Sequence, residues 1–145
     1  MPRVTELLHR KGTDVTTIEP SARVIDAATL MNRRRIGALV VVEAGRVVGM
    51  FTERDVLRRV VAERLDPAAI SVSEVMTRDV VSCIADDGMD HARKLFMQQR
   101  VRHLPVLDER GHLAGLISIG DLNAWDLTGT RVHVQALEEY LYGAA

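Results

Sequence analysis

Short apolar runs and amphipathic stretches follow one another in the same order in both halves of this 145-residue chain. The four segments of the first half lie at 15–18, 24–31, 38–42 and 47–51. Their counterparts in the second half lie at 80–84, 89–96, 104–107 and 113–117. The second segment of each half has helical spacing, and the last two are β-rich runs separated by a polar turn with glycine. The pattern predicts two βαββα units, each closed by a helix that begins after Thr52 or Ser118.

The two halves align residue by residue. Asp14 falls on Asp79, and the shift of 65 residues becomes 66 after one residue inserted at the second turn. Identical pairs include Ala27 and Ala92, Arg35 and Arg100, Leu39 and Leu104, Gly49 and Gly115, and Asp55 and Asp121. One such unit has too little apolar surface for a core of its own. We therefore expect an α/β (α+β) fold in which two tandem repeats pack around a pseudo-two-fold axis, with clefts between them.

The expected domain boundaries follow from this alignment. They are an N-terminal extension at 1–13, repeat 1 at 14–62, a linker at 63–78, repeat 2 at 79–128 and a C-terminal helix at 129–145. Apolar residues at Val4, Leu7 and Leu8 predict a short helix in the extension. The terminal helices either cap the pair, help to form a dimer or face solvent.

Composition narrows the classes of partner and compartment. Aromatic residues make up 3% of the chain, so the core must consist of aliphatic side chains and methionine. A net charge of −1 provides no field of one sign for nucleic acid. A lone Cys83 excludes an intrachain disulfide, and no apolar run is long enough for a signal peptide or a membrane span. We expect a cytoplasmic protein without a membrane or nucleic-acid partner.

One local motif occurs in both repeats, at 49–55 and 115–121: glycine, two apolar residues, Thr or Ser, two further residues and Asp. A hydroxyl at a helix start with an acid three residues later is a capping box, which needs no ligand. The same helix start offers N–H groups to a phosphate, and the carboxylate suits two neighbouring ribose hydroxyls. Taken singly, each motif is explained by capping alone.

The paired motif, together with Arg102-His103-Leu104-Pro105-Val106, resembles a CBS-domain pair, or Bateman module, of the small stand-alone bacterial type. The resemblance extends over about 15–125. It implies that AMP, ADP, ATP or NAD(H), and in some members S-adenosylmethionine, binds between the repeats. It also implies a disc-shaped homodimer that regulates an effector protein, which the sequence does not identify.

The resemblance further implies two unlike clefts. The residues expected in the first are Thr52, Arg54, Asp55, Ile84, Val101, Arg102, His103 and Pro105. There Asp55 would hold the ribose, while Arg54, Arg102 and His103 would meet phosphate. The residues expected in the second are Ile18, Ile36, Gly37, Ala38, Val40, Ser118 and Asp121. The second lacks a local cation, so we expect the first to bind a mononucleotide more tightly.

Other functions find less support. Ser118 and Asp121 look superficially like a nucleophile and its base, but their spacing at a helix start explains them better, so we expect no enzyme. The five histidines have no metal-ligand spacing relative to Cys83, so we expect no metal site. Two alternatives stay open: a protein-interaction module without a ligand, and an S-adenosylmethionine binder.

Overall fold

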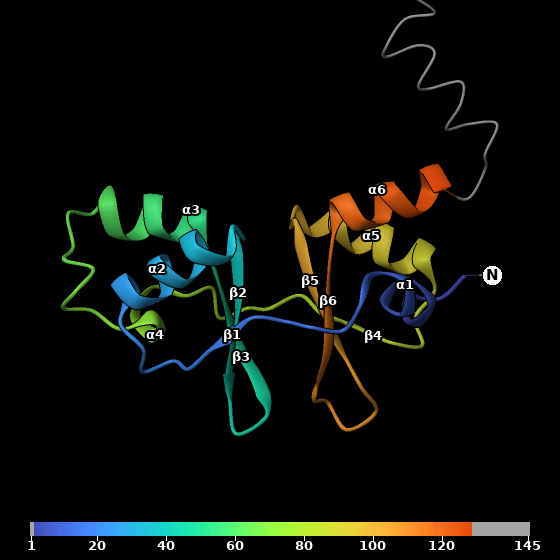
Figure 1. Ribbon diagram of the computed structural model, residues 1–145, viewed down its shortest axis with the longest axis horizontal. Coiled ribbons are helices and arrows are strands. Elements are labelled where there is room, and N and C mark those ends of the chain that lie inside the picture. The colour runs from blue at the N-terminus through green and yellow to red at the C-terminus, as the bar shows by residue number, and fades with distance from the viewer. Residues whose placement is uncertain (1, 129–145) are drawn as a thin grey trace, which may run out of the picture.

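The computed structural model describes residues 2–128 and consists of two halves side by side, each with one small sheet and its helices (Figure 1). The C-terminal helix expected at 129–145 lies outside the described residues. Within the described part, no helix is long and apolar enough to cross a bilayer.

The first half forms the predicted βαββα unit. Its elements are β1 (Thr17–Ile18), α2 (Val24–Arg34), β2 (Ala38–Glu43), β3 (Arg46–Thr52), α3 (Glu53–Asp55) and the π-helical turn η1 (Val56–Val61), which continues α3. The strands form a sheet in the order β1-β2-β3, with β1 parallel and β3 antiparallel to β2. The apolar run at 15–18 yields a strand of two residues because only its end pairs with β2.

The second half repeats this topology. Its elements are β4 (Cys83–Ile84), α5 (Met89–Gln99), β5 (His103–Leu107), β6 (Leu113–Ser118) and α6 (Ile119–Thr128). The sheet order is β4-β5-β6, and both hairpins carry a register shift at the equivalent place, after Val41 and after Val106. The tandem α/β repeat predicted from the sequence is therefore confirmed.

Each half is completed by a helix that precedes the other half in the chain. The helix α1 (Val4–Lys11) buries Val4, Leu7 and Leu8 in the core of the second half. The short helix α4 (Val72–Val75), which the sequence placed in the linker, packs in the core of the first half. The extension and the linker are thus parts of the two cores.

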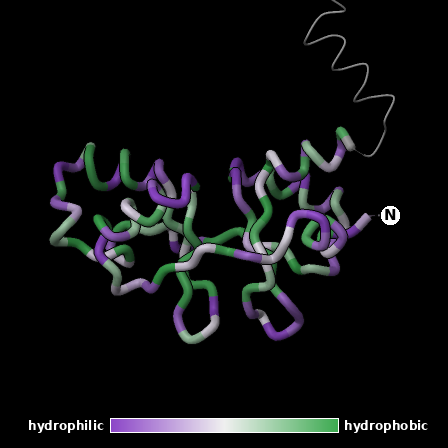
Figure 2. Tube along the Cα trace, in the orientation of Figure 1, coloured by the Kyte–Doolittle hydropathy of each residue, from purple (hydrophilic) through white to green (hydrophobic). Residues whose placement is uncertain are grey.

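The two sheets pack against each other at the centre of the molecule. Ala38, Val40 and Met50 are buried there against Val80 and Leu116 of the second half. Figure 2 shows these central strands as largely hydrophobic, while the hairpin loops that project away from them are more polar. The expected burial of the open sheet faces brings the end of β3, at Thr52, close to the start of β5, at His103.

The first helix of each half ends at an arginine with left-handed backbone. Arg35 has φ 53° and Arg100 has φ 53°, a conformation that ends a helix and is more often adopted by glycine. The chain therefore turns sharply at Arg100, immediately before β5.

Close packing between β3 and the linker yields a stability prediction. A methyl group added at Gly49 would lie 2.5 Å from Met76 Sδ and 3.1 Å from the Thr77 backbone oxygen. The carbonyl cannot withdraw easily because it accepts a backbone hydrogen bond from β3. Gly49→Ala should therefore lower the free energy of unfolding by about 1–3 kcal/mol, the usual cost of overpacking. Urea denaturation measures the loss.

Gly120→Ala in α6 is the matched control. The nearest atom to its added methyl group is Ser118 Oγ at 3.5 Å, an ordinary contact. This variant should be as stable as the parent chain, or up to about 1 kcal/mol more stable, because alanine favours helix. Equal stability of Gly49→Ala and the parent chain would contradict the packing described.

Candidate functional site

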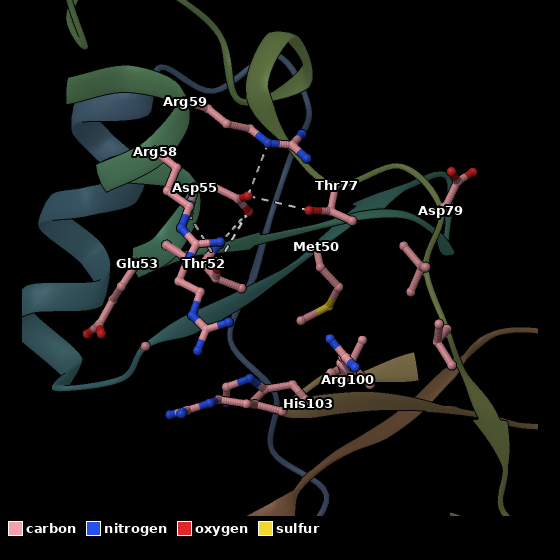
Figure 3. Close-up of a pocket in the computed structure, with 16 residues that line it drawn as sticks. Met50, Thr52, Glu53, Asp55, Arg58, Arg59, Thr77, Asp79, Arg100 and His103 are labelled. Atoms are coloured by element: carbon pink, nitrogen blue, oxygen red, sulfur yellow. Dashed lines mark hydrogen bonds and ion pairs between the residues drawn. The ribbon is translucent and has the colours of Figure 1, made fainter. Parts of the chain in front are cut away.

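A cavity of about 400 Å³ lies between the two halves (Figure 3). Its walls come from the motif of the first half, from the linker and from the turn between α5 and β5. The lining residues are Gly37, Met50, Thr52, Glu53, Arg54, Asp55, Arg58, Arg59, Thr77, Asp79, Val80, Val81, Arg100, Val101, Arg102 and His103. The structure therefore brings Thr52, Arg54, Asp55, Arg102 and His103 of the first expected cleft together in one cavity.

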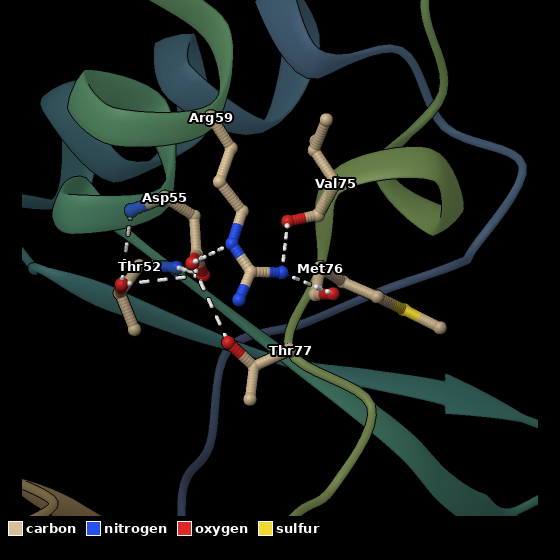
Figure 4. Close-up of polar contacts among 6 residues, drawn as sticks. All are labelled: Thr52, Asp55, Arg59, Val75, Met76 and Thr77. Atoms are coloured by element: carbon tan, nitrogen blue, oxygen red, sulfur yellow. Dashed lines mark hydrogen bonds and ion pairs between the residues drawn. The ribbon is translucent and has the colours of Figure 1, made fainter.

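Among residues 2–128, Asp55 is the one charged residue that is buried, with 6% of its surface exposed. One carboxylate oxygen, Oδ2, accepts the backbone N–H of Thr52 at 3.0 Å and its hydroxyl at 3.3 Å (Figure 4). The Thr52 hydroxyl in turn accepts the Asp55 N–H at 3.4 Å. The motif does form the capping box, and it does so on the wall of the cavity.

The other oxygen of Asp55 has weaker partners. Thr77 donates to Oδ1 from 3.4 Å, and Arg59 Nε lies 3.6 Å from the same atom. Arg59 also donates to the carbonyls of Val75 and Met76 at the end of α4. This guanidinium therefore offsets the buried charge and holds α4 against the first half. Sequence reasoning missed Arg59 and Thr77, although the spacing from Asp55 to Arg59 is that of an i,i+4 pair on a helix.

Four further arginines line the cavity, and we call them the arginine cluster: Arg54, Arg58, Arg100 and Arg102. Among residues 2–128 none of the four forms an ion pair, and the other carboxylates on the wall are Glu53 and Asp79. Arg58 and Arg100 were not predicted. The αL turn at the end of α5 places Arg100 on the wall, a feature that periodicity does not reveal.

His103 is the first residue of β5 and lies opposite Ser118 on β6. Burial lowers the pKa of His103, and the charges of Lys11 and Arg102 lower it further, against the opposing effect of Asp121. The ring is therefore neutral at neutral pH and can donate or accept one hydrogen bond to a ligand.

Two residues expected in this cleft lie elsewhere. Ile84 pairs with Leu107 at the far end of β5 from His103, and 49% of its surface is exposed. Pro105 is buried in β5 opposite Leu116. Neither lines the cavity. The apolar part of the wall comes instead from Met50, Val80, Val81 and the expected Val101.

The second motif forms the same capping box and holds a cation. Asp121 accepts the backbone N–H of Ser118 at 2.8 Å, and the Ser118 hydroxyl accepts the Asp121 N–H at 3.0 Å. Lys11, at the end of α1, donates to the same carboxylate at 2.5 Å and to the Leu116 carbonyl. Burial raises the pKa of Asp121, but the hydrogen bonds from Lys11 and Ser118 outweigh it and keep the pKa below its usual value. Lys11 corrects the expectation that this region lacks a local cation.

The remaining residues of the second expected cleft are dispersed. Gly37 lines the first cavity, whereas Ala38 and Val40 are buried between the sheets. Ile18 packs on the core of the first half. Ile36 lines a second cavity, of about 460 Å³, together with Arg35 and Glu53. Neither of these two cavities includes Ser118 or Asp121.

Within residues 2–128, no group of three or more His, Cys, Asp or Glu side chains is placed to hold a metal ion.

Comparison with known proteins identifies the repeated unit. The family model of the CBS domain matches residues 4–62 and 72–127. The CBS domain-containing protein YhcV of Bacillus subtilis is 37% identical over 110 residues, which cover 76% of this chain and 77% of that protein.

Solved structures agree with this match. A putative signal-transduction protein with CBS domains from Burkholderia ambifaria is 38% identical with a TM-score of 0.82, covering 88% of this chain and 95% of that one. The CBS domain protein PAE2072 from Pyrobaculum aerophilum, complexed with AMP, is 26% identical with a TM-score of 0.76, covering 94% and 98%. Together with the two βαββα units and their paired motifs, these matches show that the chain belongs to the CBS domain family and carries a pair of CBS domains.

Proposed function

We propose that the protein is a non-catalytic regulatory sensor that binds an adenine nucleotide in the cavity between its CBS domains. The observation that carries this proposal is that one cavity brings together a carboxylate, Asp55, the arginine cluster and His103. The AMP complex of the related Pyrobaculum protein supports it.

The groups that line the cavity suit the two ends of a nucleotide. Asp55 Oδ1 has only long contacts, so it retains capacity to accept ribose hydroxyls. The arginine cluster and His103 supply donors for phosphate, and guanidinium groups bind phosphate in a bidentate manner. Val80, Val81 and Val101 provide apolar surface for the adenine ring.

An S-adenosylmethionine binder and a module without a ligand are both less compatible with the residues that line the cavity. S-adenosylmethionine carries a sulfonium cation, which the arginine cluster would repel. In a module without a ligand, the four arginines would repel one another in the cavity, since they have no ion pair within the described chain. ADP, ATP and NAD(H) share the adenosine and phosphate chemistry of AMP and belong to the same proposal.

The reactive side chains near the site are not arranged as a catalytic pair, which supports a regulatory role. Thr52 and Asp55 are engaged in the helix cap, and His103 is not among their hydrogen-bond partners. Cys83 is buried in the core of the second half, where burial, with the charge of Asp87, raises its pKa to about 12. Its thiol is therefore protonated and unsuited to be a nucleophile.

We propose that nucleotide binds more tightly in this cavity than near the second motif. A ribose approaching Asp121 would compete with Lys11 for the same carboxylate. A ribose approaching Asp55 meets no such competitor of equal strength, because the Arg59 contact is longer.

We further propose that the protein is a cytoplasmic homodimer that regulates an effector protein. Leu57 and Val61 support the dimer, since they lie four residues apart on η1 and each is 61% exposed. Adjacent exposed apolar side chains are more typical of an interface than single ones are. The cytoplasm is the compartment in which the proposed ligand is available and Cys83 stays reduced.

Carboxylate substitution tests the nucleotide site. Asp55→Asn removes the charge and one acceptor while keeping the shape, so AMP affinity should fall about tenfold or more, the scale of a charged hydrogen bond. Asp121→Asn should change AMP affinity less. Isothermal titration calorimetry on the full chain measures both, and circular dichroism checks that each variant is folded. Equal losses would contradict the ranking of the two sites, and no AMP binding by the parent chain would count against the proposed function.

The pH dependence of binding tests His103. A phosphate next to the ring raises the pKa that burial has lowered, so the bound protein holds more protons than the free protein. Because binding takes up a proton, the contribution of His103 to nucleotide affinity should increase as the pH falls from about 8 to about 6. His103→Asn should lose that contribution, whereas the titration of the phosphate itself affects both proteins alike. Identical pH profiles of the dissociation constant would exclude His103 from the phosphate site.

Sedimentation tests the dimer. Leu57→Glu places a charge on the η1 face and should weaken self-association at least about tenfold, because an unpaired charge is costly to bury. Ile25→Glu is the control, since Ile25 is also exposed, at 41%, but lies on α2. Analytical ultracentrifugation over a range of concentrations compares the two variants, and equal dimerisation of Leu57→Glu and the parent chain would assign the interface elsewhere.

A further inference from the structure

The arginine cluster exceeds what one phosphate group needs. We infer that the preferred ligand of the cavity carries two or more linked phosphates, as in an adenosine di- or triphosphate or in a dinucleotide with a pyrophosphate bridge. This inference rests on the proposed function and narrows it.

The cluster comes from both halves of the molecule. Arg54 and Arg58 lie one turn apart where α3 passes into η1, so their side chains leave the same helix face. Arg100 and Arg102 approach from the opposite wall, on the turn from α5 to β5. In Figure 3, Arg58 and Arg100 extend into the cavity from these two sides, and Asp79 lies away from both of them. The positive charge is therefore distributed over both walls of the cavity rather than gathered at one point.

The fold does not require these arginines. The aligned positions in the other repeat are occupied by Gly120 for Arg54, Ala124 for Arg58 and Gly37 for Arg102. Only Arg100 has an arginine counterpart, Arg35, and both end a helix in the left-handed conformation. Because the same topology forms with small, uncharged residues at three of the four positions, the cations of the first site serve something other than folding.

Arg59 is excluded from this count, because Asp55 and the end of α4 already occupy its guanidinium. The four remaining guanidinium groups each present a fork of donors suited to two phosphate oxygens. A single terminal phosphate has three free oxygens and cannot engage four forks placed on opposite walls. A chain of phosphates can engage donors along its length. Its additional negative charges also neutralise more of the four arginines.

Affinity ratios on the intact chain test the inference. Isothermal titrations with AMP, ADP, ATP and NADH should show at least one of the three larger ligands binding about tenfold or more tightly than AMP, since a charged hydrogen bond accounts for about that factor. ADP and ATP would identify a nucleoside polyphosphate, whereas NADH alone would identify a dinucleotide. Either result supports the inference.

Arg58→Gln provides the residue-level test. It should lower the affinity for the tightest ligand about tenfold and that for AMP by a smaller factor, so that the ratio between them falls. Arg33→Gln, which removes the same charge from the exposed end of α2, should leave the ratio unchanged. Thermal unfolding of both variants verifies that they are folded.

The outcomes distinguish a ligand with one phosphate from a ligand with linked phosphates and from no nucleotide at all. If AMP binds as tightly as ADP, ATP and NADH, the inference about linked phosphates is wrong and the adenine-nucleotide sensor stands. If none of the four ligands binds, both fail. An unchanged ratio in Arg58→Gln would remove Arg58 from the phosphate contacts and overturn the assignment of the cluster.

Discussion

The structure depends on the fact that neither repeat can bury its own apolar surface. Each sheet has only three strands, and the face that its helices leave open packs on the sheet of the other half through Ala38, Val40 and Met50. A unit of this size without that contact would expose much of its core to water. Sheet packing brings the end of β3 opposite the start of β5, and the cavity lies at that junction. The binding site is thus a result of the way in which two incomplete cores stabilise each other.

The sequence was sufficient to predict the repeat, the order of its elements and the central members of the cavity. Thr52 and Asp55 were predictable because they belong to the motif that occurs in both repeats, and Arg102 and His103 because they stand in the segment that carries the family resemblance. Lys11 and Thr77 were not, because they lie outside the aligned segments and reach a site only when α1 and the linker pack. The resemblance implies that apolar strand residues near Ile84 hold the adenine. Only the last two residues of the apolar run at 80–84 form β4, and Val80 and Val81 line the cavity in place of Ile84.

Similar backbones around the two motifs carry different chemistry. Both motifs form the same capping box, and both carboxylates have a cationic neighbour. At Asp55 the cation is Arg59, which binds three groups at once and leaves the carboxylate partly available. At Asp121 it is Lys11, which has a short direct contact with the carboxylate. The origin of each cation explains the difference: one belongs to the same helix as its acid, and the other comes from a separate element.

The crossed placement of α1 and α4 bears on how such a chain could have arisen. If a single repeat placed its leading helix as this chain does, that helix would complete the core of a second copy. Two copies exchanging their leading helices form a domain-swapped dimer. Fusion of the two genes turns that exchange into an intramolecular one and replaces dependence on protein concentration with the high effective concentration of a short linker. Within this single chain the exchange of α1 and α4 is intramolecular, so both cores are completed at any protein concentration.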